Sequence, residues 1–258
     1  MKRRIFLHQG VAAMLAGTAL TAPLGAAAAL PDTVARIKRS VVGVGTYLQT
    51  RSPAIAFAGT GFVVGDGLSV ITNAHVVPDA LDGARKETLG VVVGSAAAVQ
   101  FRAATLVGLD REHDLAHLRL EGTPLPALTL SERDDAREGQ ALAFTGFPLG
   151  MVLGLYPATH RALLAAITPV VRPSLSARGL DARAIAQLQR AAFTVYQLDG
   201  TAYPGNSGSP VFDPETGTVL AVINMVFVKG LKETAITNPS GITYAVPVSH
   251  VRALLQRQ

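Results

Sequence analysis

A serine between two glycines is the sequence feature with the clearest chemical meaning. The segment reads Gly205-Asn206-Ser207-Gly208-Ser209-Pro210 and directly precedes an apolar run. Glycines on both sides allow a tight turn in which successive backbone N–H groups point inward. Such donors stabilise the negative charge that develops on a carbonyl oxygen under attack. Ser207 could supply the attacking hydroxyl.

A serine nucleophile needs a base, and the base needs a carboxylate to orient it. The sequence offers His75 just after one apolar run and Asp114 at the start of another. Asp110 is an alternative carboxylate, but the apolar residues that follow Asp114 are those of a buried strand. The order His75, Asp114, Ser207 therefore predicts nucleophilic catalysis by a hydroxyl, an imidazole and a carboxylate.

Composition excludes several other kinds of protein. The chain has 258 residues, of which 49% are hydrophobic and 16% charged, and it has no cysteine. A coiled coil, a charged disordered chain, a disulfide scaffold, a thiol nucleophile and a cysteine-ligated metal are thereby excluded. His113 and His117 have a spacing seen in metal sites, but no third ligand is evident, so we expect neither a metal nor a cofactor.

The positive charge is placed unevenly along the chain. The formal net charge is +5, but residues 1–29 contain Lys2, Arg3 and Arg4 and no acid. The remainder has 20 basic residues against 18 acidic ones, which is too balanced for a polyanion-binding surface. We therefore expect no nucleic-acid partner.

The first 29 residues are predicted to be a cleaved export signal. A basic start is followed by an apolar run from Val11 to Leu20, too short to span a membrane, and by small residues that allow cleavage after Ala28 or Ala29. The segment from Arg3 to Leu7 is typical of a twin-arginine signal, with an ordinary Sec signal as the alternative. We expect a periplasmic or secreted bacterial protein with no membrane span after signal removal.

The rest of the chain has the pattern of an all-β protein. Short apolar runs rich in Val, Ile, Thr and Phe are separated by Gly, Pro, Asp or Asn. The predicted strands are Val41–Leu48, Ile55–Val64, Ser69–Thr72, Val91–Val93, Ala98–Val107, Leu115–Leu120, Leu142–Thr145, Ala162–Val171, Phe193–Leu198, Val211–Phe212, Val219–Val228 and Ile242–Val246.

Helical periodicity is clear in two segments only. Residues 181–192 and 248–257 each place apolar side chains on one face, which predicts a short inserted helix and a C-terminal helix. The Pro-containing, acidic segment 121–139 is the best boundary between two β halves. We therefore predict two domains, 30–125 and 126–258, after the signal.

Four motifs in this order resemble a chymotrypsin-fold (trypsin-like) serine protease of the bacterial HtrA/Deg-like or glutamyl-endopeptidase-like branch. They are Gly59-Thr60-Gly61-Phe62-Val63-Val64, Thr72-Asn73-Ala74-His75, Asp114-Leu115-Ala116 with Leu118, and Gly205-Asn206-Ser207-Gly208-Ser209-Pro210. The resemblance covers residues 31–258. It implies two six-stranded antiparallel β-barrels with the catalytic residues in the cleft between them.

The resemblance also implies a role for each site residue. Ser207 is the nucleophile, His75 the general base and then acid, and Asp114 the group that orients His75. The backbone N–H groups of Gly205 and Ser207 form the oxyanion hole, with help from Asn206. The substrates are polypeptides, cleaved by an endopeptidase whose activity rises between about pH 6 and 8 as His75 loses its proton.

The chain departs from both branches of this family. Only twelve residues follow Val246, so we expect no PDZ domain. Glutamyl endopeptidases bind an acidic P1 side chain with a histidine where this chain has Asn224. A substrate pocket lined by Thr201, Ala202, Asn224, Met225 and Val226 predicts a small or medium apolar P1 residue.

Other functions are weaker alternatives. An α/β-hydrolase would need Gly-x-Ser-x-Gly, and it would place the serine before the acid and the histidine. A catalytically inactive member of the fold that binds peptides or acts as a chaperone is the main alternative. The insert 172–192 is either a surface decoration or a regulatory element over the Ser207 turn. The sequence leaves the oligomeric state open.

Overall fold

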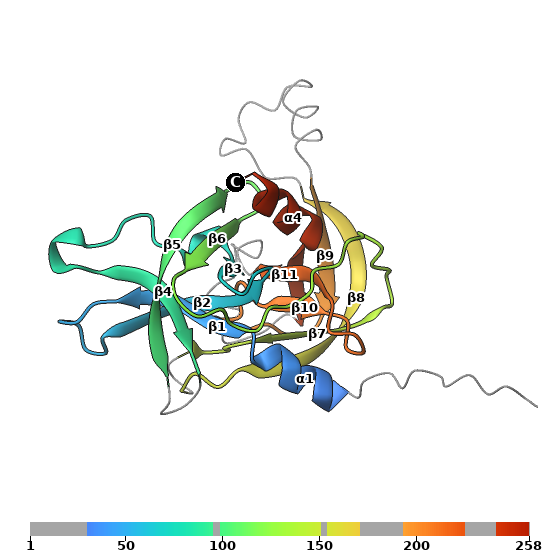
Figure 1. Cartoon of the computed structure of the whole chain (residues 1–258). Helices are drawn as coiled ribbons and strands as arrows, with labels where there is room; N and C mark the ends of the chain where they lie inside the picture. Colours follow the sequence, from blue (N-terminus) through green and yellow to red (C-terminus); the bar gives the residue numbers. More distant parts are fainter. Residues whose placement is uncertain (1–29, 95–98, 151–153, 171–192, 225–240, 258) are drawn as a thin grey trace, which may run out of the picture.

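Two β-barrels make up most of the protein (Figure 1). The computed structural model describes residues 30–94, 99–150, 154–170, 193–224 and 241–257. The expected export signal, the inserted helix 181–192 and the wider insert 172–192 lie outside these residues. In the described part of the chain, no helix combines the length and the apolar character needed to cross a membrane.

The first barrel is closed by six antiparallel strands in the order β1-β2-β3-β6-β5-β4. Their bounds are β1 Val41–Tyr47, β2 Ile55–Val64, β3 Ser69–Thr72, β4 Thr88–Val93, β5 Gln100–Asp110 and β6 Leu115–Leu120. β-Branched and aromatic residues dominate most of these segments and favour the extended backbone. Two short 3-10 helices, η1 Ala74–Val76 and η2 Gly83–Arg85, lie between β3 and β4.

The second barrel closes in the order β10-β11-β12-β9-β8-β7, which is the same ring of pairings in the opposite direction. Its strands are β7 Ala141–Gly146, β8 Ala158–Val170, β9 Phe193–Asp199, β10 Pro210–Phe212, β11 Val219–Asn224 and β12 Ile242–Pro247. The predicted all-β fold with two six-stranded barrels is therefore confirmed.

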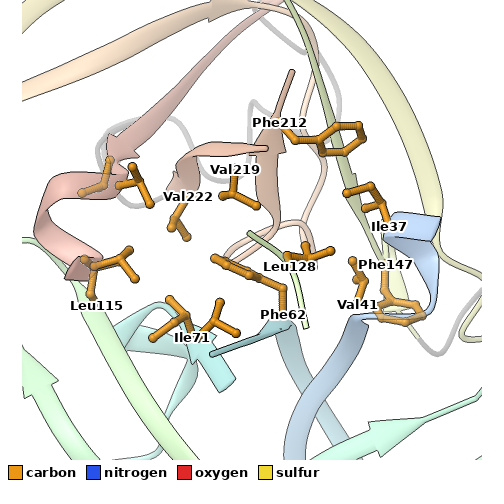
Figure 2. Close-up of a cluster of buried hydrophobic side chains, with 14 of the residues drawn as sticks. Ile37, Val41, Phe62, Ile71, Leu115, Leu128, Phe147, Phe212, Val219 and Val222 are labelled. Atoms are coloured by element: carbon orange, nitrogen blue, oxygen red, sulfur yellow. The ribbon is translucent and has the colours of Figure 1, made fainter. Parts of the chain in front are cut away.

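Three apolar clusters hold the molecule together. One fills the first barrel around Val63 and Leu118, and another fills the second barrel around Phe144 and Leu198. The third lies between the barrels, where Phe62 of β2 and Phe212 of β10 belong to the same cluster (Figure 2). Because successive side chains point to opposite faces of a strand, Phe62 faces this junction while its neighbour Val63 faces the barrel interior.

Two helices pack against the junction from opposite ends of the chain. The C-terminal helix α4 (Val248–Gln256) was predicted, and it buries Val248, Val251 and Leu254 in the inter-barrel cluster. The helix α1 (Leu30–Lys38) was not predicted, and it places Ile37 in the same cluster. Asp32 in its first turn and Arg36 and Lys38 in its last turn complement the helix dipole.

Candidate active site

His75 lies in η1, directly after β3, and faces the Asp114 carboxylate. The distance from His75 Nδ1 to Asp114 Oδ2 is 2.6 Å, and the His75 backbone N–H donates to Asp114 Oδ1 over 2.9 Å. The Nδ1 proton must therefore point at the carboxylate, which leaves the lone pair of Nε2 to accept a proton. The imidazole is partly exposed, with 28% of the side chain accessible.

Asp114 is held from both barrels. Its Oδ2 also accepts a hydrogen bond of 2.9 Å from Asn224 Nδ2, which comes from the end of β11 in the second barrel. Its carbonyl oxygen accepts from the Ala74 N–H and from Asn73 Nδ2. Asp114 has a backbone φ of +55°, a left-handed conformation that costs a non-glycine residue free energy. These contacts offset that cost and fix the carboxylate on His75.

Asp110, the alternative carboxylate, faces a different histidine. Its Oδ1 accepts the backbone N–H groups of Glu112 and His113, and its Oδ2 lies 2.9 Å from His113 Nδ1. Burial would raise the pKa of Asp110, but the His113 backbone and imidazole hydrogen bonds, with the charges of His113 and Arg257, lower it below its usual value. The structure thus pairs His75 with Asp114. Asp110 instead binds Glu112 and His113 in the turn that precedes Asp114.

The Ser207 turn has the conformation that its glycines predict. Gly205 has a φ of +101° and Gly208 a φ of +86°, both in the left-handed region. The Asn206 N–H donates to the Tyr203 carbonyl and the Gly208 N–H to the Ile223 carbonyl. Among the described residues, the Gly205 and Ser207 N–H groups have no acceptor, which leaves two donors for a substrate oxygen.

Asn206 does not contribute to this pair of donors. Its N–H is used within the turn, and its completely buried side chain has no hydrogen-bond partner in the described part of the chain. Its Oδ1 lies near Gly146, where a Cβ would come within 2.8 Å of it. The expectation that Asn206 helps the oxyanion hole is therefore not supported by its placement.

Thr60 of β2 joins the Ser207 turn to the first barrel. Its N–H donates to the Ser207 carbonyl over 2.8 Å, and its hydroxyl donates to the Gly205 carbonyl over 2.6 Å. The same hydroxyl oxygen accepts the Phe147 N–H over 3.0 Å. The sequence marked Thr60 as part of a motif, but its role as a link between the barrels was not foreseen.

The His75 segment and the Ser207 turn meet at Gly59. A Cβ on Gly59 would lie 2.7 Å from the Val76 side chain and 3.1 Å from the Ser207 carbonyl oxygen. A side chain at position 59 would thus push apart the segment that carries His75 and the turn that carries Ser207. The structure brings His75 and Asp114 into contact and places Ser207, of which 7% is exposed, in the adjoining turn.

The predicted substrate pocket needs one correction. Asn224 is fully buried and its amide donates to Asp114, so it supports the carboxylate and does not line a pocket. A polar residue at the end of the buried run 219–223 must find a hydrogen-bond partner, and this is the signal that could have identified its role. Only the assignment of Asn224 to the pocket is affected, because the sequence alone does not fix which face of β11 carries this residue.

The remaining pocket residues are only partly described. Thr201 and Ala202 are partly buried, and Ala202 packs against the apolar cluster of the second barrel. The Ala202 N–H donates to the Thr243 hydroxyl, which itself donates to the Gly200 carbonyl. Met225 and Val226 lie outside the described residues, so the preference for a small or medium apolar P1 residue stays a prediction.

Comparisons with known proteins identify the family of the chain. A family model described as a trypsin-like peptidase domain matches residues 59–222. A probable periplasmic serine endoprotease, DegP-like, from Halomonas elongata is 27% identical over 74% of this chain and 32% of its own length. A mitochondrial serine protease named HTRA2 from Drosophila pseudoobscura pseudoobscura is 29% identical over 80% of this chain and 40% of its own length. The chain thus spans 32% to 40% of the length of these two relatives.

Solved structures agree on the fold. The crystal structure of a protease from M. tuberculosis in its active form superimposes with a TM-score of 0.61 and 23% sequence identity. The match covers 87% of this chain and 82% of that one. At this level of identity the likeness concerns the arrangement of the two barrels.

Proposed function

Because the chain belongs to the family of trypsin-like peptidase domains, we propose that it is a serine endopeptidase that uses Ser207, His75 and Asp114. The observation that carries this proposal is the contact of His75 with Asp114, in a segment whose next residue, Val76, meets the Ser207 turn at Gly59. Both oxygens of Asp114 are engaged by His75, and the turn beside them keeps two backbone N–H groups without an acceptor among the described residues.

The proposed reaction follows from these positions. The Ser207 hydroxyl attacks the carbonyl carbon of a peptide bond while His75 Nε2 takes its proton. The Gly205 and Ser207 N–H groups hold the oxygen on which negative charge develops. The protonated imidazole, stabilised by Asp114, passes its proton to the leaving amine. Water then attacks the acyl-enzyme in the same way and regenerates the Ser207 hydroxyl.

We also propose that the protein is exported and acts in the bacterial envelope or outside the cell. The support is the arrangement of residues 1–29 together with the DegP-like relative that is named as periplasmic. The HTRA2 relative is named as mitochondrial, so relatedness alone does not assign the compartment. The two domains proposed for the exported protein are 30–125 and 126–258.

Labelling with a fluorophosphonate tests the nucleophile directly. We expect the reagent to modify Ser207, and we expect Ser207→Ala to lose both the label and peptide hydrolysis, with kcat falling on the order of 10⁶-fold. Mass spectrometry of the labelled peptide and a fluorogenic peptide assay measure these effects.

Ser209 in the same turn provides a matched control. It is fully buried, and its hydroxyl has no hydrogen-bond partner among the residues that the structure describes. Ser209→Ala therefore removes a neighbouring hydroxyl without touching the proposed nucleophile. This variant should keep the label. A folded wild-type protein that takes up no label would instead favour the inactive peptide-binding module.

A further inference from the structure

A second group of titratable side chains lies next to the turn that delivers Asp114. We call it the histidine latch and define it as His113, Asp110, His250 and Arg257. Asp110 is the last residue of β5, and His113 belongs to the turn between β5 and β6. His250 lies on the first turn of α4, and Arg257 directly follows that helix. None of these residues has a part in the proposed reaction.

The two imidazoles of the latch are stacked. The centroids of the His113 and His250 rings are 3.8 Å apart, and the angle between the rings is 20°. Phe193 of β9 packs edge-on against both rings, at 4.7 Å from His113 and 5.7 Å from His250. The His113 side chain is only 13% exposed. This contact joins α4 to the residue that immediately precedes Asp114.

Asp110 extends the latch into the backbone of the turn. Its side chain accepts two backbone N–H groups of the turn and faces His113 Nδ1 at 2.9 Å and Arg257 Nη1 at 3.4 Å. The turn ends in the left-handed conformation of Asp114, which persists only where its surroundings enforce it. The latch thus anchors the turn that leads into Asp114.

Protonation of His250 is unfavourable in this arrangement. Burial and the charge of His113 lower the pKa of His250, against a smaller opposite influence of Asp110, Asp134 and Glu112. The positive end of the α4 dipole, one turn away, also disfavours a cation at His250. Arg252, the basic residue within α4, is paired with Asp134 over 3.2 Å.

The sign of the resulting pH dependence follows from linkage. Because the pKa of His250 in the folded protein lies below its unfolded value of about 6.5, the unfolded chain binds the proton more readily. The stability contributed by the stack is complete above pH 6.5 and is lost as the pH falls below that value. Protonation of His250 then places a positive charge against the His113 ring.

We propose that the histidine latch holds Asp114 in its catalytic position and opens when His250 takes up a proton. His250 is then a positioning residue, which acts on Asp114 through His113 and the turn 110–113. The proposal rests on the catalytic role proposed above for Asp114. It makes α4 a pH-sensitive support of the active site.

The test compares wild type with His250→Phe, which keeps an aromatic ring on His113 but cannot titrate. The proposed catalytic residues are the same in both proteins, so the ratio of wild-type to variant kcat isolates the latch. Loss of the orienting carboxylate costs about 10⁴-fold in this chemistry. Because opening of the latch would displace Asp114 only partly, we expect the ratio of wild-type to variant kcat to fall about tenfold between pH 7.5 and pH 5.0. A ratio that stays constant over this range would overturn the proposal.

His160→Phe serves as the matched control. His160 is also a histidine whose pKa is lowered by burial, and it is stacked on Phe144 in the second barrel. The same substitution there should leave the ratio of wild-type to variant kcat independent of pH. If His250→Phe does not fold, His250→Gln is measured with the same criterion.

Hydrogen exchange separates failure of the latch from failure of the proposed function. Amide exchange of residues 110–114, measured relative to His250→Phe at the same pH, should accelerate about tenfold between pH 7.5 and pH 5.0. If neither label nor hydrolysis is found but exchange accelerates, the latch stands and the protease proposal fails. If hydrolysis is present and the exchange ratio does not change, the latch alone fails.

Discussion

At the scale of single residues, the amide of Asn224 is the least expected part of the site. It donates to Asp114 Oδ2 from the second barrel, while His75 approaches the same oxygen from the first. The shared oxygen ties the position of the carboxylate to the relative position of the two barrels. Asn224 is therefore predicted to act in catalysis by orienting Asp114.

Removal of this amide should slow the chemical step. A hydrogen bond to a charged group contributes about 1.5–3 kcal/mol, and about 1.4 kcal/mol corresponds to a factor of ten in rate. Asn224→Ala should thus lower kcat roughly 10- to 100-fold and leave KM nearly unchanged, as steady-state kinetics with a peptide substrate can measure. Ile223→Val, a small change in the same buried strand, should leave kcat unaltered. A rise of KM with normal kcat would contradict this prediction and would indicate that Asn224 contributes to the substrate pocket.

Residue types and spacing were sufficient to select His75 and Asp114, which the structure brings together, but not their supports. Asp110 and Asp114 are chemically alike, and the choice between them depended on which one begins a buried strand. The contacts of Asn224 and His250 come from segments more than 100 residues away, and no local pattern encodes such pairs. Their identification requires the three-dimensional structure.

At the scale of elements, the Ser207 turn depends on close approach between backbones. A Cβ on Gly205 would lie 2.3 Å from the Phe147 carbonyl oxygen, which is part of the backbone and cannot move aside cheaply. Gly205→Ala should displace the Gly205 N–H from the oxyanion hole. Because one such donor contributes a factor of about 10²–10³, kcat should fall by that amount in the peptide assay.

Gly139 separates this effect from simple backbone strain. It has a φ of +85°, and no atom lies within 4 Å of the position of its Cβ. Gly139→Ala should therefore cost about 1–2 kcal/mol of stability through its left-handed conformation and leave kcat unchanged. Equal kcat values for the two alanine variants would show that the position of Gly205 is not critical.

Strands were easier to predict than helices for a physical reason. Ile55–Val64, Ser69–Thr72 and Leu115–Leu120 were predicted with the bounds that the structure has. The beginning of β8 was missed because Thr159, His160 and Arg161 interrupt its apolar character. The helix α1 was missed although it is as long as α4, because polar and charged residues interrupt its apolar pattern and only Thr33 and Ile37 are buried.

At the scale of the whole molecule, the segment that connects the two barrels forms β-bridges with a strand of each barrel. Leu128 bridges to Val64 at the end of β2, and Leu130 bridges to Val219 at the start of β11. The inter-barrel cluster adds side chains from both barrels, α1 and α4 (Figure 2). Sequence analysis predicted a boundary in this segment, but a composition pattern cannot reveal how tightly the two sides pack.

This packing predicts that the two barrels unfold together. Phe62 lies in the inter-barrel cluster with no exposed surface, so Phe62→Ala should cost about 3–5 kcal/mol. For a protein of this size that corresponds to a fall in Tm of about 10 °C, in a single calorimetric transition.

Leu118→Ala, inside the first barrel, should lower the same single transition because neither barrel persists without the shared cluster. Leu81→Ala, at an exposed position, should leave Tm within about 1 °C of wild type. Two calorimetric peaks, of which only one moves in Leu118→Ala, would mean that the barrels are independent and that the position of Asp114 does not depend on their junction.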